Sequence, residues 1–149
     1  MNEKYMKIAI EEAKKALDCG EVPVGCVIVK DNQIISQSHN LKESLKCVTK
    51  HAELVAIEDA SKVLNNWRLI NCDLYVTLEP CPMCASAIMQ SRISNVYCGL
   101  TSSDSISHDT VLSIFSNTYN SKPVNFSCGY FSFECKKLLD LFFKLKRSS

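Results

Sequence analysis

Three side chains that bind soft or borderline metal ions occur at two places in the sequence: His51, Cys81 and Cys84. One imidazole nitrogen and two thiolates form a zinc-ligand set without a fourth protein ligand, and a catalytic zinc ion keeps that position for water. Glu53 follows the histidine by two residues. There its carboxylate could take a proton from such a water and return it to a leaving group. The spacing therefore predicts a zinc-dependent hydrolytic site with Glu53 as the catalytic proton carrier.

Cys47 leaves a second interpretation of the ligand set open. It precedes His51 by four residues, so that Cys47, His51 and the Cys81/Cys84 pair could form a closed Cys₃His structural zinc site. Glu53 would then be only a negative charge in the first turn of a helix, where the helix dipole favours a carboxylate. On this interpretation the chain is a non-enzymatic zinc-binding module.

The size and composition of the chain are those of one globular domain. It has 149 residues, of which 46% are hydrophobic and 22% charged, so we expect a single domain over residues 1–149. No apolar run has the length of a membrane helix and residues 1–5 lack a signal-peptide profile, so we expect a cytoplasmic protein that binds no membrane. The net charge of +1 neither demands nor excludes a nucleic-acid partner.

Nine cysteines are a high number for a chain of this length. Disulfides belong mainly to secreted proteins, and nothing in this sequence indicates secretion. We therefore expect two of the cysteines, Cys81 and Cys84, to bind metal and the others to be reduced thiols.

Hydrophobic periodicity predicts alternating strands and helices that must position these residues. The predicted strands are residues 26–29, 33–37, 74–78, 95–99 and 124–128. The predicted helices are residues 2–18, from 50 or 51 to 64, from 81 or 82 onward, 111–115 and 131–146. The first two strands form a hairpin through the turn at Asp31 and Asn32.

The predicted elements bring the two parts of the ligand set together at helix starts. His51 and Glu53 lie in the first turn of one helix. Pro80 separates the strand at residues 74–78 from the next helix, and that helix begins at the cysteines. Because a helix N-terminus favours negative charge, this placement lowers the pKa of both thiols before a metal binds.

Several other residues carry expectations of a structural kind. We expect a buried stripe on the second helix, made of Ala52, Val55, Ala56 and Val63. Trp67 is interpreted as part of the core, and residues 101–109 as a serine-rich surface loop with His108 in solvent. Residues 117–122 are expected to form a loop. The basic residues of the last helix are typical of a solvated helix end.

The motifs taken together resemble those of the tRNA-specific adenosine deaminases, members of the cytidine-deaminase-like superfamily. His-x-Glu followed by Pro-Cys-x-x-Cys is the known signature of zinc deaminases that act on nucleobases. The matching segments are Glu21-Val22-Pro23-Val24-Gly25, Asn40, His51-Ala52-Glu53, residues 74–84 and Ser91-Arg92-Ile93, and the end of the last helix, Phe142-Phe143-Lys144, is also similar. The resemblance covers most of residues 1–100.

This resemblance implies a fold and an activity. The fold would be a three-layer α/β/α arrangement with a mixed five-stranded sheet, usually in a homodimer with one Zn²⁺ per subunit. The activity would be hydrolysis of the wobble adenosine in a tRNA anticodon loop to inosine, with the target base flipped out of its stack.

The resemblance also implies a role for each matching residue. His51, Cys81 and Cys84 would bind zinc, and Glu53 would transfer protons. Asn40 would form a hydrogen bond with the nucleoside. The base pocket would be lined by Pro23, Val24 and Ala52.

Two segments differ from the family pattern. The family usually has Asp-Pro-Thr-Ala before the ligand histidine, where this chain has Cys47-Val48-Thr49-Lys50. After the fourth strand the family usually has an Arg-Asp pair and a Gly/Ala-rich loop that contacts RNA, where this chain has residues 101–108. The second difference motivates an alternative substrate for the same chemistry: a free nucleobase or nucleoside, such as guanine, cytosine or cytidine.

Overall fold

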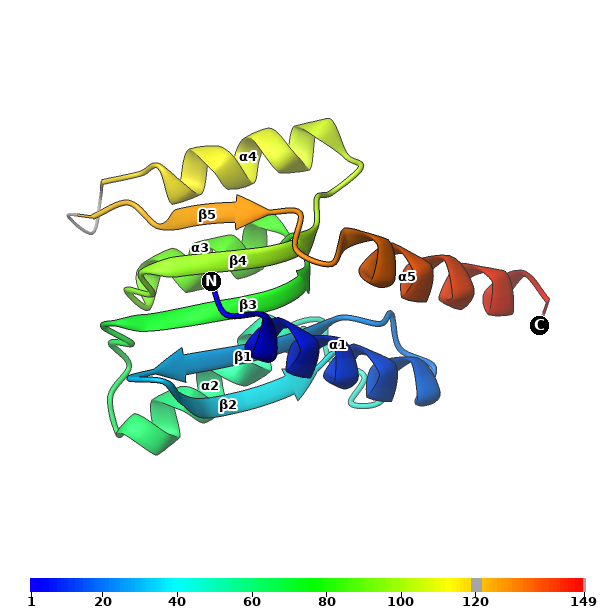
Figure 1. Cartoon of the computed structure of the whole chain (residues 1–149), viewed down its shortest axis with the longest axis horizontal. Coiled ribbons are helices and arrows are strands. Elements are labelled where there is room, and N and C mark those ends of the chain that lie inside the picture. Colours follow the sequence, from blue (N-terminus) through cyan, green and yellow to red (C-terminus); the bar gives the residue numbers. More distant parts are fainter. Residues whose placement is uncertain (119–121, 149) are drawn as a thin grey trace.

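The computed structural model describes residues 1–118 and 122–148, which contain five helices and five strands (Figure 1). The helices are α1 (Glu3–Asp18), α2 (Ala52–Leu64), α3 (Pro82–Gln90), α4 (Ser105–Phe115) and α5 (Ser132–Arg147). The strands are β1 (Gly25–Lys30), β2 (Gln33–His39), β3 (Cys72–Leu78), β4 (Asn95–Leu100) and β5 (Asn125–Cys128).

The strands form one mixed sheet in the order β2-β1-β3-β4-β5. β1 pairs antiparallel with β2 and with β3, whereas β3, β4 and β5 run parallel. The β1–β2 turn contains Asp31 and Asn32 at φ values of 50° and 60°, as a tight hairpin turn requires. The predicted five-stranded mixed sheet and the hairpin are therefore confirmed.

The two faces of the sheet bury different side chains. Val27, Val29 and Tyr75 pack with α1. Cys26, Ile28, Leu74 and Val76 alternate with them along the same strands and pack on the other face with α2 and α3. Helices thus cover both faces, with α1 and α5 on one side and α2, α3 and α4 on the other (Figure 1). The predicted three-layer α/β/α arrangement is confirmed.

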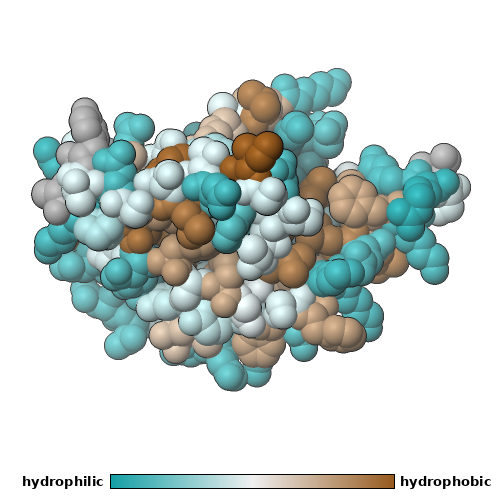
Figure 2. Space-filling model, turned by 90° about the horizontal axis from the view of Figure 1, so that it is seen from above, coloured by the Kyte–Doolittle hydropathy of each residue, from teal (hydrophilic) through white to brown (hydrophobic). Residues whose placement is uncertain are grey.

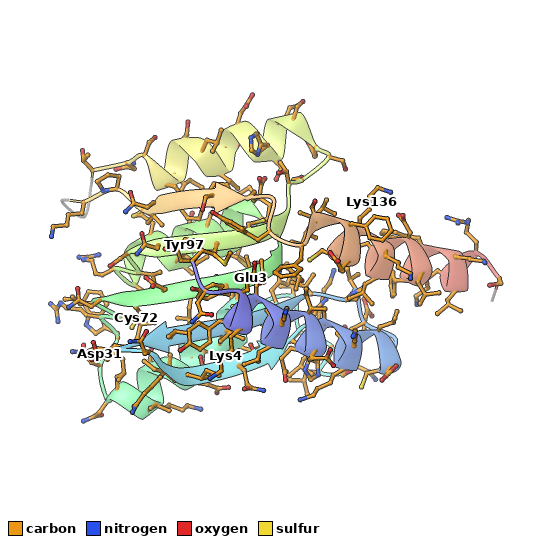
Figure 3. The ribbon with its side chains drawn as sticks, viewed as in Figure 1. Glu3, Lys4, Asp31, Cys72, Tyr97 and Lys136 are labelled. Atoms are coloured by element: carbon orange, nitrogen blue, oxygen red, sulfur yellow. The ribbon has the colours of Figure 1, made fainter. Side chains whose placement is uncertain are left out.

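The α1 face also carries a row of aromatic rings that crosses the sheet. Tyr5, Tyr75, Tyr97 and Tyr130 follow one another with ring centroids 5.5, 5.0 and 6.0 Å apart. Tyr97 belongs to β4, the strand next to the edge strand β5 (Figure 3). Such pairs add to the stabilisation from buried area, and here they join the first helix to the segment before α5.

Gly25 lets α1 approach the start of β1. A Cβ atom at this position would lie 1.8 Å from the carbonyl oxygen of Ala9 and 2.6 Å from the amide nitrogen of Ala13. No side chain fits there, so the glycine of the Glu-Val-Pro-Val-Gly motif sets how closely the first helix packs on the sheet.

The predicted loop at residues 101–109 is wrong in its second half, because α4 already begins at Ser105. The side chain of Asp104 accepts hydrogen bonds from the backbone N–H groups of Ile106 and Ser107 and so caps the helix. Asp104 is a favourable N-cap residue, but the serines around it led to the prediction of a loop. The predicted helix at 111–115 is the last part of α4, and residues 119–121 of the predicted loop at 117–122 lie outside the described residues.

Two burial predictions are also wrong. Trp67 is 52% exposed and Val63 is 65% exposed, although both were expected in the core. α2 ends at Leu64 and its buried side is narrow, made of small residues such as Ala52, Ala56 and Ala60. Val63 lies on the side of α2 away from this stripe, and Trp67, which follows the helix, lies on the surface beside Arg68 and Arg92.

α5 extends beyond the sheet at the right of the molecule (Figures 1 and 2). Cys135 and Phe142 are its buried residues, whereas Phe133 is 75% exposed. Within the part of the chain described, no helix has the combination of length and apolar character that a membrane span needs.

Candidate metal centre and substrate cavity

The start of α2 and the start of α3 meet at the carboxyl end of β3. His51 is the N-cap residue of α2 and Cys81 is the N-cap residue of α3, with Pro82 in the first helical position. Cys84 follows one turn later and is buried. The Sγ atoms of Cys81 and Cys84 lie 3.7 and 3.5 Å from Nδ1 of His51. The predicted ligand set is therefore brought together from two segments 30 residues apart.

These distances fit a tetrahedral zinc site. With Zn–N of about 2.05 Å and Zn–S of about 2.3 Å, two such ligands on a tetrahedron lie about 3.6 Å apart. The ligand atoms of the three residues all lie within 4.8 Å of one another. Among the described residues this is the one group of His, Cys, Asp or Glu that meets this criterion, and Cys47 does not belong to it. Instead, Sγ of Cys47 lies 3.2 Å from the hydroxyl of Thr49.

The two thiols differ in their readiness to ionise. A hydrogen bond from Cys84 and the backbone N–H groups of Met83 and Cys84 lower the pKa of Cys81 to about 5, against the effect of burial. The same thiol pair and burial raise the pKa of Cys84, so the prediction that the helix start lowers the pKa of both thiols is wrong for Cys84. The Cys81 thiolate thus keeps Cys84 protonated through their hydrogen bond. A metal ion that binds both sulfur atoms would replace this shared proton.

Glu53 lies in the first turn of α2 and is almost fully buried. Burial raises the pKa of its carboxyl to about 7. The residue lines a cavity of about 200 Å³ together with His51 and Cys81. This volume is below the roughly 300–1,000 Å³ of typical ligand pockets. The cavity therefore suits one flat heterocycle rather than a larger folded ligand.

Asn40 is held at the cavity by the segment before β1. Its backbone N–H donates to the carbonyl of Val24 at 3.1 Å, and its Nδ2 group donates to the carbonyl of Val22 at 3.4 Å. Its Oδ1 atom accepts from the backbone N–H of Lys42. The side chain is buried and has a fixed orientation, which is what an amide needs to recognise a ligand.

The other predicted pocket residues divide into two groups. Val24 and Ala52 line the cavity, as expected. Pro23 is fully buried and is not among the described residues that line it. Four further lining residues were not predicted from the sequence to face the pocket: Val22, Lys42, Leu78 and Glu79. Val22, Leu78 and Glu79 belong to the matching motifs, but which member of each segment faces the cavity depends on the backbone path.

Glu21 fixes the loop between β2 and α2, which begins beside Asn40 and ends at His51. Its carboxylate accepts hydrogen bonds from the N–H groups of Glu43 and Ser44, at 2.9 and 2.6 Å, and from the Ser44 hydroxyl at 2.6 Å. Burial alone would raise the pKa of Glu21, but these hydrogen bonds lower it. A fully buried carboxylate thus holds one wall of the cavity.

Glu79, which also lines the cavity, contacts the half-buried side chain of His108 on α4. Nδ1 of His108 lies 2.6 Å from Oε1 of Glu79, whose side chain is fully buried. The expectation that His108 lies free in solvent is therefore wrong. Because α4 begins at Ser105, the histidine is on a helix that packs against the turn carrying Cys81.

Comparison with known proteins places this arrangement in a family. Residues 1–100 match the family model described as the cytidine and deoxycytidylate deaminase zinc-binding region. The tRNA-specific adenosine deaminase of Bacillus subtilis (strain 168) is 41% identical over 143 residues, which cover 96% of this chain and 89% of the relative. The chain belongs to the tRNA-specific adenosine deaminase family. As a member of this family of deaminases it is a zinc-dependent hydrolase, and its His/Cys/Cys group holds one zinc ion per subunit.

Two solved structures are similar to this member of the tRNA-specific adenosine deaminases. One, from a study of A-to-I editing by tRNA:A34 deaminases at the wobble position, has a TM-score of 0.84 and 35% identity, covering 93% of this chain and all of that one. The other, a guanine deaminase from Bacillus subtilis, has a TM-score of 0.67 and 32% identity, covering 85% of each chain. The fold thus serves deaminases of different substrates.

Proposed function

We propose that this protein deaminates the wobble adenosine of tRNA hydrolytically to inosine. The observation that carries the proposal is the convergence of His51, Cys81 and Cys84 beside the buried carboxyl of Glu53, at a cavity of about 200 Å³. It occurs in a chain that is 41% identical to a tRNA-specific adenosine deaminase over nearly its whole length. We propose residues 1–149 as a single domain of this kind.

The reaction replaces the 6-amino group of adenine by oxygen from water and releases ammonia. Bound to His51, Cys81 and Cys84, zinc supplies Lewis acidity that makes water a nucleophile at neutral pH. Glu53 accepts a proton from that water and donates it to the departing amine. Its pKa of about 7 suits both steps, because a group that titrates near the working pH can accept and release a proton.

The remaining cavity residues bind and orient the base. The Asn40 amide is held for a hydrogen bond to the heterocycle. Ala52 is the first residue of α2, where backbone N–H groups have no partner within the helix and can donate to a ring nitrogen. Val24 provides an apolar wall, and Pro23 supports it from behind. A cavity of this size admits adenine only when the base is flipped out of its stack.

The test compares RNA and free substrates. Zinc-loaded protein is incubated with tRNA anticodon stem-loops carrying adenosine at the wobble position, and inosine is detected by mass spectrometry. We expect inosine at that position only, formed at least about 10²-fold more slowly by Glu53→Gln. Deamination of free bases without deamination of RNA would overturn the assignment.

A free nucleobase is the second candidate substrate. The 32% identity to a guanine deaminase favours it, as does the 101–108 segment, which differs from the family's RNA-contacting loop. Ammonia release from guanine, cytosine or cytidine, measured with the same preparation, would support this alternative.

We also propose that the protein acts as a homodimer in the cytoplasm on tRNA. Exposed apolar side chains on one helical layer support a subunit interface there: Val63 of α2, Met83 of α3, and Ile106 and Leu112 of α4. The tRNA-modifying relatives support the cytoplasmic location. Sedimentation equilibrium measures the subunit number, and a monomer at micromolar concentration would contradict the dimer.

A further inference from the structure

We propose that a second RNA-binding surface lies at the end of the sheet opposite the zinc ligands, and that it binds the phosphate backbone of the RNA stem. This inference rests on the proposed action on tRNA. We call it the arginine surface and define it by Lys62, Trp67, Arg68, Arg92 and Lys122.

The exposed indole of Trp67 organises this surface. The guanidinium carbon of Arg68 lies 4.3 Å from the centroid of the indole ring, and that of Arg92 lies 5.3 Å from it. Cation–π contacts of this kind hold arginine side chains in defined orientations. Trp67 is 52% exposed, so its ring lies at the surface, and both guanidinium groups lie beside it there.

The cations of the arginine surface are not neutralised. Within residues 1–118 and 122–148, neither arginine nor either lysine forms an ion pair. The chain has no acidic residue from 60 to 72, and from 80 to 133 its acids are Asp104 and Asp109. Asp31 and Asp73 lie at the same end, close to Cys72 (Figure 3), and within the described residues neither forms an ion pair with these four cations. Uncompensated arginines with planar donor groups fit phosphate oxygens.

The surface also has the shape for an extended partner. Arg92 and Lys122 line a groove of about 430 Å³ together with Asn71, Ser94 and Asn125. Lys62, Trp67 and Arg68 line an adjacent hollow after α2. These residues surround the beginnings of β3, β4 and β5, where Cys72 is seen in Figure 3. Hydrophilic side chains predominate at this end (Figure 2).

The distance to the catalytic site fits one RNA bound at both places. His51 precedes α2 and Trp67 follows it, and 13 helical residues span about 20 Å. A nucleotide flipped into the cavity therefore leaves its stem within reach of the arginine surface. Phosphate contacts give affinity without reading sequence, so this surface would help bind tRNA stems in general.

The experiment separates the two sites by the length of the RNA. Binding of zinc-loaded protein to a labelled stem-loop with a full anticodon stem is measured over a range of salt, beside a stem-loop cut to the shortest stable stem. For Lys62→Gln/Arg68→Gln we expect about tenfold weaker binding of the full stem-loop. We also expect a salt slope smaller by about 1 to 2, because each lost phosphate contact removes close to one. KM should rise with kcat unchanged, and the short stem-loop should show no difference.

A matched variant and the dimer provide the controls. Lys4→Gln/Lys14→Gln removes the same charge from α1, on the other layer of the fold, and should bind both RNAs as the wild type does. Equal affinities and slopes for the surface variant and the wild type would overturn the proposal. A loss of subunit association in the surface variant would also overturn it, by assigning the surface to a protein interface. Absence of inosine with the wild type would instead refute the proposed function.

Discussion

At the scale of single residues, the site depends on which groups can lose a proton. Cys81 has a lowered pKa of about 5, and Glu53 has a raised pKa of about 7. The lowered pKa makes Cys81 a thiolate, the form that binds a metal. The raised pKa suits Glu53 to its proposed role in proton transfer. Both result from the immediate surroundings: hydrogen bonds from the start of α3 to the thiolate, and burial of the carboxyl.

Glu53→Gln should leave metal binding intact and stop the reaction. Glutamine has nearly the same size, and the three ligand residues remain, so we expect one zinc ion per chain by atomic absorption. Turnover should fall by about 10² to 10⁴, the usual contribution of a positioned acid–base group. Single-turnover kinetics at saturating RNA measures this. Residual activity within threefold of wild type would exclude Glu53 as the proton carrier.

Cys47→Ser is the matched control for the ligand set. Since its sulfur contacts Thr49 rather than the other ligands, zinc content and turnover should stay at wild-type values. Cys84→Ser, by contrast, should lower zinc content. Loss of zinc from the Cys47 variant would revive the closed structural site.

At the scale of elements, short connections hold the site between α2, α3 and the segment before β1. The hydroxyls of Ser38 and Ser36 donate to the carbonyls of Ala52 and Ala56 and so fasten α2 to β2. The carboxylate of Glu21 holds the loop between β2 and α2 by accepting hydrogen bonds from its backbone N–H groups. These hydrogen bonds pair the buried carboxylate of Glu21 and the hydroxyls of Ser36 and Ser38, and they keep this wall of the cavity rigid.

Glu21→Gln should destabilise the protein in a pH-dependent way. At pH 7 we expect a loss of about 1.5 to 3 kcal/mol in the free energy of unfolding, because hydrogen bonds to a charged acceptor are replaced by weaker ones. The pKa of Glu21 is lowered below its ordinary value of 4.5 in the folded state. Its stabilisation is therefore present above pH 4.5 and lost as the pH falls through the folded-state pKa.

Urea unfolding of the zinc-loaded protein from pH 7 to pH 3 checks this. The difference between wild type and Glu21→Gln should shrink below pH 4.5. Glu43→Gln, an exposed position in the same loop, should show no such trend. A difference that is constant with pH would refute the carboxylate's role.

Gly25→Ala should destabilise the packing of α1 on the sheet. The new methyl group would overlap the backbone of Ala9, so helix and strand must separate. Overpacking of this kind costs about 1 to 3 kcal/mol, and a clash with backbone lies at the upper end. Thermal unfolding should show a lower Tm. An unchanged Tm would mean that α1 can move away from β1 without a loss of stability.

At the scale of the whole molecule, zinc joins parts of the chain that are distant in sequence. His51 precedes α2, which follows the β1–β2 hairpin, and the cysteines lie at the start of α3, which connects the parallel strands β3 and β4. The metal therefore cross-links the antiparallel and parallel halves of the fold. Opposite this centre, the arginine surface leaves a second end of the molecule free for RNA.

Removal of zinc should therefore lower global stability as well as activity. A ligand that binds only the folded state stabilises it by mass action, about 2.7 kcal/mol at 100 times Kd. Dialysis against a chelator should lower the Tm and abolish turnover, and stoichiometric zinc should restore both. For Glu53→Gln, the Tm should fall with the chelator and recover with zinc as in the wild type, while turnover stays low throughout. A Tm that is unaffected by the chelator would show that the fold does not depend on the metal.

Local patterns in the sequence were sufficient to find the ligand set, to single out Glu53 as the proposed proton carrier and to predict most element boundaries. His51, Cys81 and Cys84 could be recognised because metal binding restricts residue type and spacing, and helix starts follow from nearby Pro82 and the apolar period. The mixed sheet followed from the resemblance, and β1 and β2 from their hairpin signal.

Only the tertiary structure decided which side chains meet across the fold. The Glu79–His108 contact joins two elements, and the exposure of Trp67 depends on how α2 packs. Lys42 and Val22 line the cavity, whereas Pro23 lies behind it. Neighbouring residues in a loop can point in opposite directions, so burial and contact there depend on the packed backbone and not on residue type.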